Sequence, residues 1–132
     1  MRNLLPLGAL VLGALLFGGV AARAHHSFAA EYFEDQMVSL EGEVTEFQYR
    51  NPHAWVMFRV QDPQGQMAVY SAEWVGAGRL GQQGITADVL KPGDLVKISG
   101  SPGRNASQRR LHLKGIERPA DGWTWANRGR RR

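Results

Sequence analysis

Apolar and polar residues alternate along five short segments of this chain, and this two-residue period constrains its fold more than any other feature. The alternating segments cover residues 38–49, 54–61, 66–74, 95–100 and 109–117. Because side chains of a β-strand point alternately to opposite faces, each segment predicts a strand with one buried face. Asn, Asp, Pro and Gly are concentrated between the segments, as is typical of turns.

The first predicted strand changes phase along its length. Val44 shares its parity with Gly42, whereas Phe47 has the opposite parity. A phase change next to a glycine inside a strand is typical of a β-bulge or a sharp bend. Between the third and fourth strands, residues 86–90 are predicted to form one helical turn with Thr86 as its N-cap.

Five strands, a bent first strand and a short helical insert between strands 3 and 4 predict an all-β fold, a small five-stranded OB-like Greek-key barrel. An open meander or an immunoglobulin-like sandwich is the alternative, although a sandwich has about seven strands. In the fifth strand His112 has the outward parity, and we expect it to be solvated. The residues predicted to fill the core are Val44, Val56, Phe58, Val60, Val96, Ile98, Leu111 and Leu113.

Residues 1–24 have the three-part pattern of a secretory signal peptide. Arg2 precedes an apolar run over residues 4–20, and Ala22-Arg23-Ala24 places small residues at the −3 and −1 positions of a cleavage site. An uncleaved membrane anchor is the alternative, but the run is shorter than the ~20 residues that span a bilayer. We therefore expect cleavage after Ala24, a periplasmic or secreted protein, and no transmembrane segment after cleavage.

Cleavage after Ala24 would leave 108 of the 132 residues, a length that suits one domain. The expected organisation is a signal peptide (1–24), a single β-barrel domain (25–118) and a poorly ordered Arg-rich tail (119–132). The mature chain would have 14 basic residues, the 16 of the whole chain less Arg2 and Arg23, against 12 acidic ones. This small excess and the expected export argue against a nucleic acid as partner. The chain has no cysteine, which excludes thiolate metal ligands.

Three motifs together resemble a known family. AHHSFAAEY spans the predicted cleavage site, with HHSFAAEY after it, NPHAW follows the first predicted strand, and LKPGD precedes the fourth. Over residues 25–117 the chain resembles a family of small secreted bacterial proteins that is classed as a domain of unknown function. The resemblance implies export and a small β-barrel-like domain, and it implies no activity.

Cleavage after Ala24 would make His25 the first residue of the mature protein. The α-amine and the ring Nδ1 of a terminal histidine can chelate one metal ion, and these donors suit Cu(II) or Zn(II). His26 adds a donor, and His53 in NPHAW is the distant candidate. The sequence thus predicts an exported, non-catalytic binding protein with His25, His26 and His53 as metal ligands and no organic cofactor. The alternative is a histidine pair that is merely tolerated at a flexible terminus.

A second functional hypothesis is a protein- or glycan-binding accessory module. Its ligand would contact Asn51 and Trp55 at the NPHAW motif and Arg104 and Arg109 near the loop between strands 4 and 5, because these loops bind ligands in OB barrels. Trp55 could instead be covered by the N-terminal segment. No nucleophile–base pair or carboxylate pair stands out, so the sequence predicts no catalytic residue.

Overall fold

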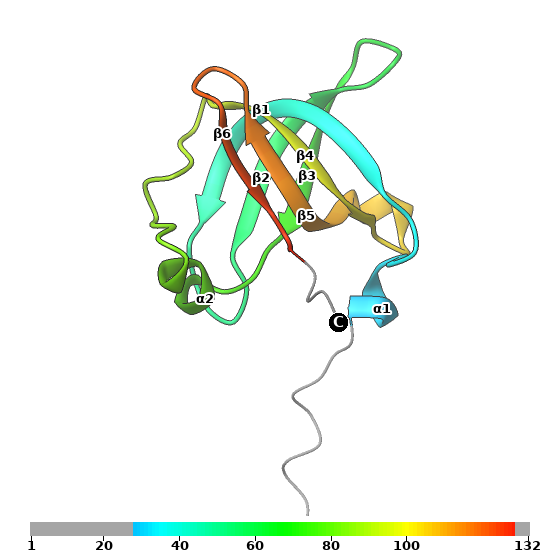
Figure 1. Cartoon of the computed structure of the whole chain (residues 1–132). Helices are drawn as coiled ribbons and strands as arrows, with labels where there is room; N and C mark the ends of the chain where they lie inside the picture. The colour runs from blue at the N-terminus through cyan, green and yellow to red at the C-terminus, as the bar shows by residue number, and fades with distance from the viewer. Residues whose placement is uncertain (1–27, 129–132) are drawn as a thin grey trace, which may run out of the picture.

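The computed structural model of this protein describes residues 28–128, which form six β-strands and three short helices (Figure 1). The strands are β1 (Val38–Gln48), β2 (Trp55–Gln61), β3 (Met67–Glu73), β4 (Leu95–Pro102), β5 (Arg110–Arg118) and β6 (Trp123–Ala126). The helices are α1 (Phe28–Glu31), α2 (Ala77–Gln82) and the 3-10 helix η1 (Ala106–Gln108).

Five of the strands close into a barrel. The strand order is β3-β2-β1-β4-β5-β6, and β3 also pairs with β5 in parallel, which joins the two sides of the sheet. All other strand pairs are antiparallel. The predicted five-stranded OB-like Greek-key barrel is therefore confirmed, and the five alternating segments correspond to β1–β5.

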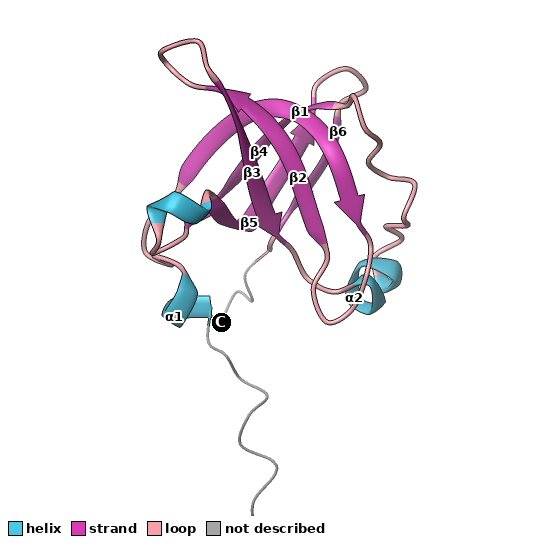
Figure 2. Cartoon of the chain, turned by 180° about the vertical axis from the view of Figure 1, so that it is seen from behind, coloured by secondary structure: helices cyan, strands magenta, loops and turns pink. Residues whose placement is uncertain are grey.

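The long strand β1 bends over the barrel and pairs with both β2 and β4 (Figure 2). Its register with β2 shifts between Val44 and Glu46, so the bulge that the phase change predicts is present. A Cβ atom added at Gly42 would lie 2.3 Å from the backbone oxygen of Arg59. This position thus needs glycine, because the two backbones approach too closely for a side chain.

The barrel interior contains all eight residues predicted to form the core, each at most 8% exposed. Side chains that lie outside the strands of the structure complete it. Trp74 follows β3 directly and is fully buried, and Leu80 of α2 closes one end. The other buried apolar side chains are Ala54, Ala72, Ile85, Leu90 and Ile116.

The helical insert lies between β3 and β4 as expected, but at a different place. Residues 86–90 form a single turn, closed by a hydrogen bond from the Val89 N–H to the Thr86 carbonyl oxygen over 3.2 Å, followed by a bend, and not a helix. The helix is α2, which begins after Gly76. A Cβ atom at Gly76 would lie 2.4 Å from the backbone oxygen of Pro52, so glycine lets α2 begin directly against the NPHAW loop. Glycine-rich composition concealed this helix because glycine disfavours helices in isolation.

The prediction of a poorly ordered tail is wrong for the described part of that segment, residues 119–128. Strand β6 pairs with β5, and Trp125 packs edge-on against buried Trp74 with ring centroids 5.0 Å apart. The Trp125 indole also donates a hydrogen bond to Gln83 over 2.7 Å. Trp125 and Trp123, which also packs against the core, thus anchor a segment whose Gly, Pro and Arg content suggested disorder.

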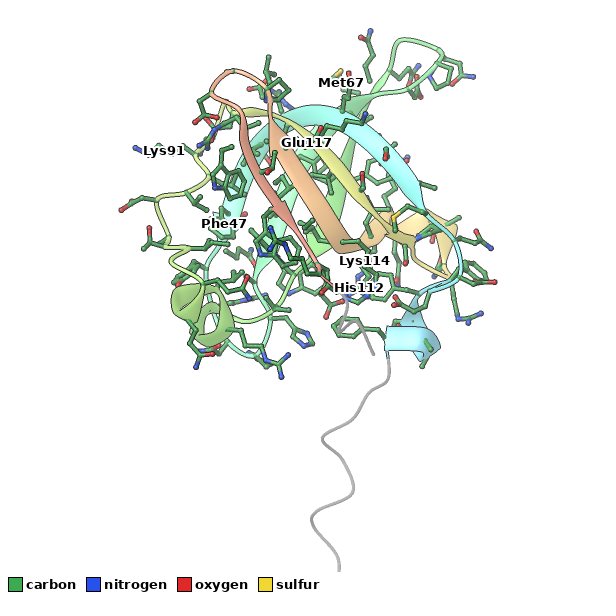
Figure 3. All side chains as sticks on the ribbon, viewed as in Figure 1. Phe47, Met67, Lys91, His112, Lys114 and Glu117 are labelled. Atoms are coloured by element: carbon green, nitrogen blue, oxygen red, sulfur yellow. The ribbon has the colours of Figure 1, made fainter. Side chains whose placement is uncertain are left out.

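Helices α1 and α2 lie at the same end of the barrel (Figure 1). His112 and Lys114 point toward α1 at this end, whereas Met67 and Glu117 lie at the opposite end (Figure 3). Within residues 28–128 no helix is both long enough and apolar enough to cross a membrane.

Candidate functional site

Three neighbouring strands place polar side chains in one row on the outside of the barrel. Trp55 pairs with Glu73, and Glu73 pairs with His112, so these side chains share a face. Their chain neighbours Val56, Ala72 and Leu111 fill the interior. Glu73 and His112 are nevertheless only 8% exposed. An outward side chain is buried only when another segment covers it.

The covering segment is the N-terminal strap, which we define as residues 28–36. Tyr32 forms an isolated antiparallel bridge with Gly103, and the Phe33 N–H donates to the carbonyl oxygen of Pro102 over 2.9 Å. Arg104 donates from Nε to the carbonyl oxygen of Ala29 over 2.9 Å, and its guanidinium lies 4.6 Å from the Phe33 ring centroid. The loop between β4 and β5 therefore fixes the strap across the polar row.

The first histidine near the strap is His53 of the NPHAW loop. His53 Nδ1 lies 2.5 Å from Oε1 of Glu73. The other carboxylate oxygen of Glu73 accepts a hydrogen bond from the Tyr32 hydroxyl. The His53 side chain is 40% exposed, whereas that of Glu73 is 11% exposed. A buried carboxylate thus holds one nitrogen of an imidazole that is itself open to solvent.

The second histidine has the same kind of partner and a different environment. His112 Nδ1 lies 2.7 Å from Oε1 of Glu34, and Lys114 Nζ lies 2.6 Å from the other oxygen of that carboxylate. The Phe28 ring stacks on the His112 ring at a centroid distance of 3.7 Å with 5° between the planes. Phe28 therefore covers one face of the imidazole, in agreement with the low exposure of His112.

The strap and the residues beneath it form one polar cluster, which consists of Tyr32, Glu34, His53, Glu73 and His112. Burial and hydrogen bonding shift three pKa values in this cluster. Burial and then the adjacent Glu73 carboxylate raise the pKa of the Tyr32 phenol, which stays a neutral donor. Burial lowers the pKa of His112 below its usual 6.5, despite the Glu34 carboxylate. Burial alone would raise the pKa of Glu34, but hydrogen bonds from Lys114 and His112 outweigh it and lower that pKa. The His112–Glu34 pair is thus a neutral imidazole that donates to a carboxylate.

The sequence profile of one family matches residues 14–112, and so includes the strap, the NPHAW loop and both histidines of the cluster. The chain belongs to the family of unknown function DUF6152. The expected membership in a family of unknown function is confirmed. No curated protein shows significant similarity to the chain.

In this DUF6152 protein, His53 lies beside the beginning of the described chain. The His53 ring centroid is 5.3 Å from that of Phe28. The other two predicted ligands, His25 and His26, lie outside the described residues, as do the predicted signal peptide (1–24) and residues 129–132. Among residues 28–128, no three His, Asp or Glu side chains form a group that could hold a metal ion.

Contacts within the DUF6152 barrel engage most residues predicted to bind a partner. The Asn51 side-chain oxygen accepts from the Gly78 N–H over 3.0 Å, which ties it to α2. The guanidinium of Arg110 lies 4.9 Å from the Trp55 ring centroid. Arg104 holds the strap, as described above. Arg109 is exposed, with its backbone in the left-handed region at φ 47°.

Three residues of the cluster were missing from the sequence-based site. The solvated environment predicted for His112 is wrong: its parity is outward, but the strap covers it. Glu73 gave no sequence signal, because it is one of many polar residues near a strand end. Tyr32 was not assigned to the site, because the sequence does not show that its segment reaches Glu73. The aromatic content of AHHSFAAEY was the available signal, since apolar side chains in a terminal segment indicate that it packs on the fold.

Proposed function

We propose that this protein is exported, begins at His25 after cleavage, and binds one Cu(II) ion. The ligands are the α-amine and ring of His25 and Nε2 of His53, with His26 as a neighbouring donor. The observation that carries the proposal is the contact between Phe28 and His53, whose ring centroids are 5.3 Å apart. Three residues span at most about 10 Å at ~3.3–3.6 Å each, so the α-amine is within reach of the His53 imidazole.

His53 has the properties of a metal ligand that is prepared for binding. Its Nδ1 lies 2.5 Å from a Glu73 oxygen, so the Nδ1 proton is donated to the carboxylate and the lone pair remains on Nε2. Metal-bound histidines usually donate their second ring nitrogen to such a carboxylate, which fixes the ring and its tautomer. The 40% exposure of the His53 side chain allows an ion to approach.

The donor set favours copper over zinc. Amine and imidazole nitrogens bind divalent metals in an order that places Cu(II) above Zn(II) and Ni(II). The amine must lose its proton to bind, and it titrates near pH ~7.7–8.0, so the affinity should fall in acid. Zn(II) is the competing ion, and we expect it to bind the same nitrogens more weakly.

A binding role without catalysis is part of the proposal. Ser101 is the cross-strand neighbour of His112, which contacts Glu34, and these are the residue types of a nucleophilic triad. However, the Ser101 hydroxyl is fully buried and has no hydrogen-bond partner in the described structure. Phe28 also covers the imidazole. These features favour a structural role for this group.

Calorimetric titration with Cu(II) in the presence of a competing chelator tests the proposal. Three forms are compared at one pH: the protein that begins at His25, the same protein with one extra Met before His25, and His53→Ala. The extra Met removes the amine chelate and keeps every imidazole. His112→Gln is the matched control, because it removes an imidazole that is not a ligand.

We expect the extended form to lose most of the affinity. His53→Ala should lose at least the roughly 10–100-fold that follows removal of a residue supporting a metal ligand. His112→Gln should lose far less affinity than His53→Ala, because it removes no ligand. Equal affinities in the first three forms would contradict the proposal and leave the two terminal histidines as a casual binding site.

A further inference from the structure

We infer that Glu73 is the positioning residue of the metal site, and that Tyr32 couples docking of the N-terminal strap to metal binding. This inference rests on the proposed function, because it names what controls the same site. Glu73 is the shared element, since one of its oxygens contacts His53 and the other contacts Tyr32.

Glu73 is fixed by its place in the barrel. It is the last residue of β3 and pairs with Trp55 of β2 on one side and His112 of β5 on the other. The backbone is therefore held from both sides at the point where the barrel closes. A carboxylate on such a rigid support can hold an imidazole in one orientation. The His53 ring belongs to a loop and would not keep a single orientation without such a partner.

The strap supplies the second partner of this carboxylate. Tyr32 is 1% exposed, and its hydroxyl donates to Glu73 only when the strap lies on the barrel. A buried carboxylate needs hydrogen-bond donors, because an unpaired buried charge is costly. Docking of the strap thus holds the Glu73 carboxylate in place through the Tyr32 hydroxyl, and this in turn orients His53.

Metal binding should act on the strap in return. An ion bound by residue 25 and His53 would link the chain ahead of the strap to the NPHAW loop, and Tyr32 lies seven residues beyond residue 25. Linkage between the two events is reciprocal: if docking favours binding, binding favours docking to the same extent. The strap and the metal site would therefore respond to each other.

The chain contains a matched control for Glu73. Glu34 also accepts from the Nδ1 of a histidine, at 2.7 Å, but its partner His112 is stacked under Phe28. Glu73→Gln and Glu34→Gln are therefore the same substitution on two carboxylate–imidazole pairs. Tyr32→Phe is the conservative variant that removes only the hydroxyl donor of Glu73.

Cu(II) affinity and the EPR spectrum of the bound ion are measured on these variants and on His53→Ala. We expect Glu73→Gln to weaken binding by roughly 10–100-fold and to alter the spectrum, because the imidazole loses its anionic partner. Tyr32→Phe should weaken binding less but still alter the spectrum. Glu34→Gln loosens the strap and contacts no proposed ligand, so it should leave the spectrum unchanged. If Glu73→Gln does not fold, Tyr32→Phe against Glu34→Gln decides the question.

Hydrogen exchange of the strap amides tests the coupling. The Tyr32 and Phe33 amides donate to the carbonyl oxygens of Phe28 and Pro102. Cu(II) should slow their exchange in the wild type and slow it less in Tyr32→Phe. If His53→Ala weakens binding while Glu73→Gln and Tyr32→Phe do not, the inference is overturned and the proposed function stands. If His53→Ala binds like the wild type, the proposed function itself fails.

Discussion

The barrel interior and the polar row beneath the strap are both buried, but different forces hold them. The interior is filled by apolar side chains such as Phe58 and Trp74, and its stability comes from packing and from the removal of apolar surface from water. The polar row buries Glu73 and His112, which are costly to bury unless each finds a partner. The comparison shows that the interior should be insensitive to pH, whereas the polar row depends on ionisation and on the strap.

The two carboxylate–imidazole pairs, Glu73 with His53 and Glu34 with His112, differ in their exposure. The His53 side chain is 40% exposed, and that of His112 is 10% exposed. The same hydrogen bond therefore leaves one imidazole available to a ligand and locks the other into the packing of the strap. Exposure, and not the pairing itself, separates the proposed metal ligand from the structural histidine.

The largest effect that we expect on stability comes from the interior. Phe58 is fully buried, so Phe58→Ala should lower the free energy of unfolding by about 3–5 kcal/mol through the cavity that it leaves. Denaturant unfolding at about pH 7.5 and pH 5.5 measures the loss, which should be similar at both. A loss below about 1 kcal/mol would mean that strand β2 does not face the core as described.

A smaller effect is expected where the strap packs on the polar row. Phe28→Ala removes the ring that stacks on His112 at 3.7 Å, and aromatic pairs contribute about 0.5–1.5 kcal/mol beyond the area they bury. The free energy of unfolding should fall by about 0.5–1.5 kcal/mol. Hydrogen exchange of the strap amides should become faster. Met37→Ala is the control, because that side chain is 60% exposed and should leave both quantities unchanged.

The smallest effect is a change in pH dependence. The pKa of His112 is lower in the folded protein than its usual 6.5, so the unfolded chain binds a proton first as the pH falls. The contribution of His112 to stability is therefore complete above about pH 6.5 and is lost as the pH falls toward the folded pKa. The charged groups facing this imidazole are Glu34, Lys114 and Glu73. The pKa of Glu34 is also lowered, and its share is lost only below its usual 4.5.

His112→Gln tests this pH dependence, because glutamine can still donate to Glu34 and cannot gain a proton. Unfolding free energies between about pH 7.5 and pH 5 should fall less steeply for the variant than for the wild type. Equal slopes for the two proteins would contradict the assignment of His112 as a buried, neutral imidazole.

The two regions also differ in how far the sequence predicts them. Two-residue alternation predicted the five barrel strands and the eight core residues, because burial of one strand face imposes that pattern directly. It did not predict α2 at Ala77–Gln82, which contains two glycines, or β6 at Trp123–Ala126, which is short and lies in a segment rich in Gly, Pro and Arg. There, contacts such as that between Trp125 and Trp74 decide the structure.

The burial of the polar row could not be predicted from the sequence alone, for a physical reason. Parity gives the direction of His112, but not what covers it, and its strap partner Glu34 lies 78 residues earlier in the chain. The position of His53 beside Phe28 likewise depends on how the strap crosses the closed barrel. His53 itself was predicted as a ligand from its residue type and its loop, whereas Glu73 and Tyr32 became recognisable only through their contacts.

The EPR spectrum of one equivalent of Cu(II) on the protein that begins at His25 tests the central claim most directly. The proposed site predicts coupling to the α-amine, the His25 imidazole and the His53 imidazole. His53→Ala should remove the coupling to one imidazole nitrogen, whereas His112→Gln should give the same spectrum as the wild type. An identical spectrum for the wild type and His53→Ala would contradict the account, because the terminal histidines would then bind copper without the barrel.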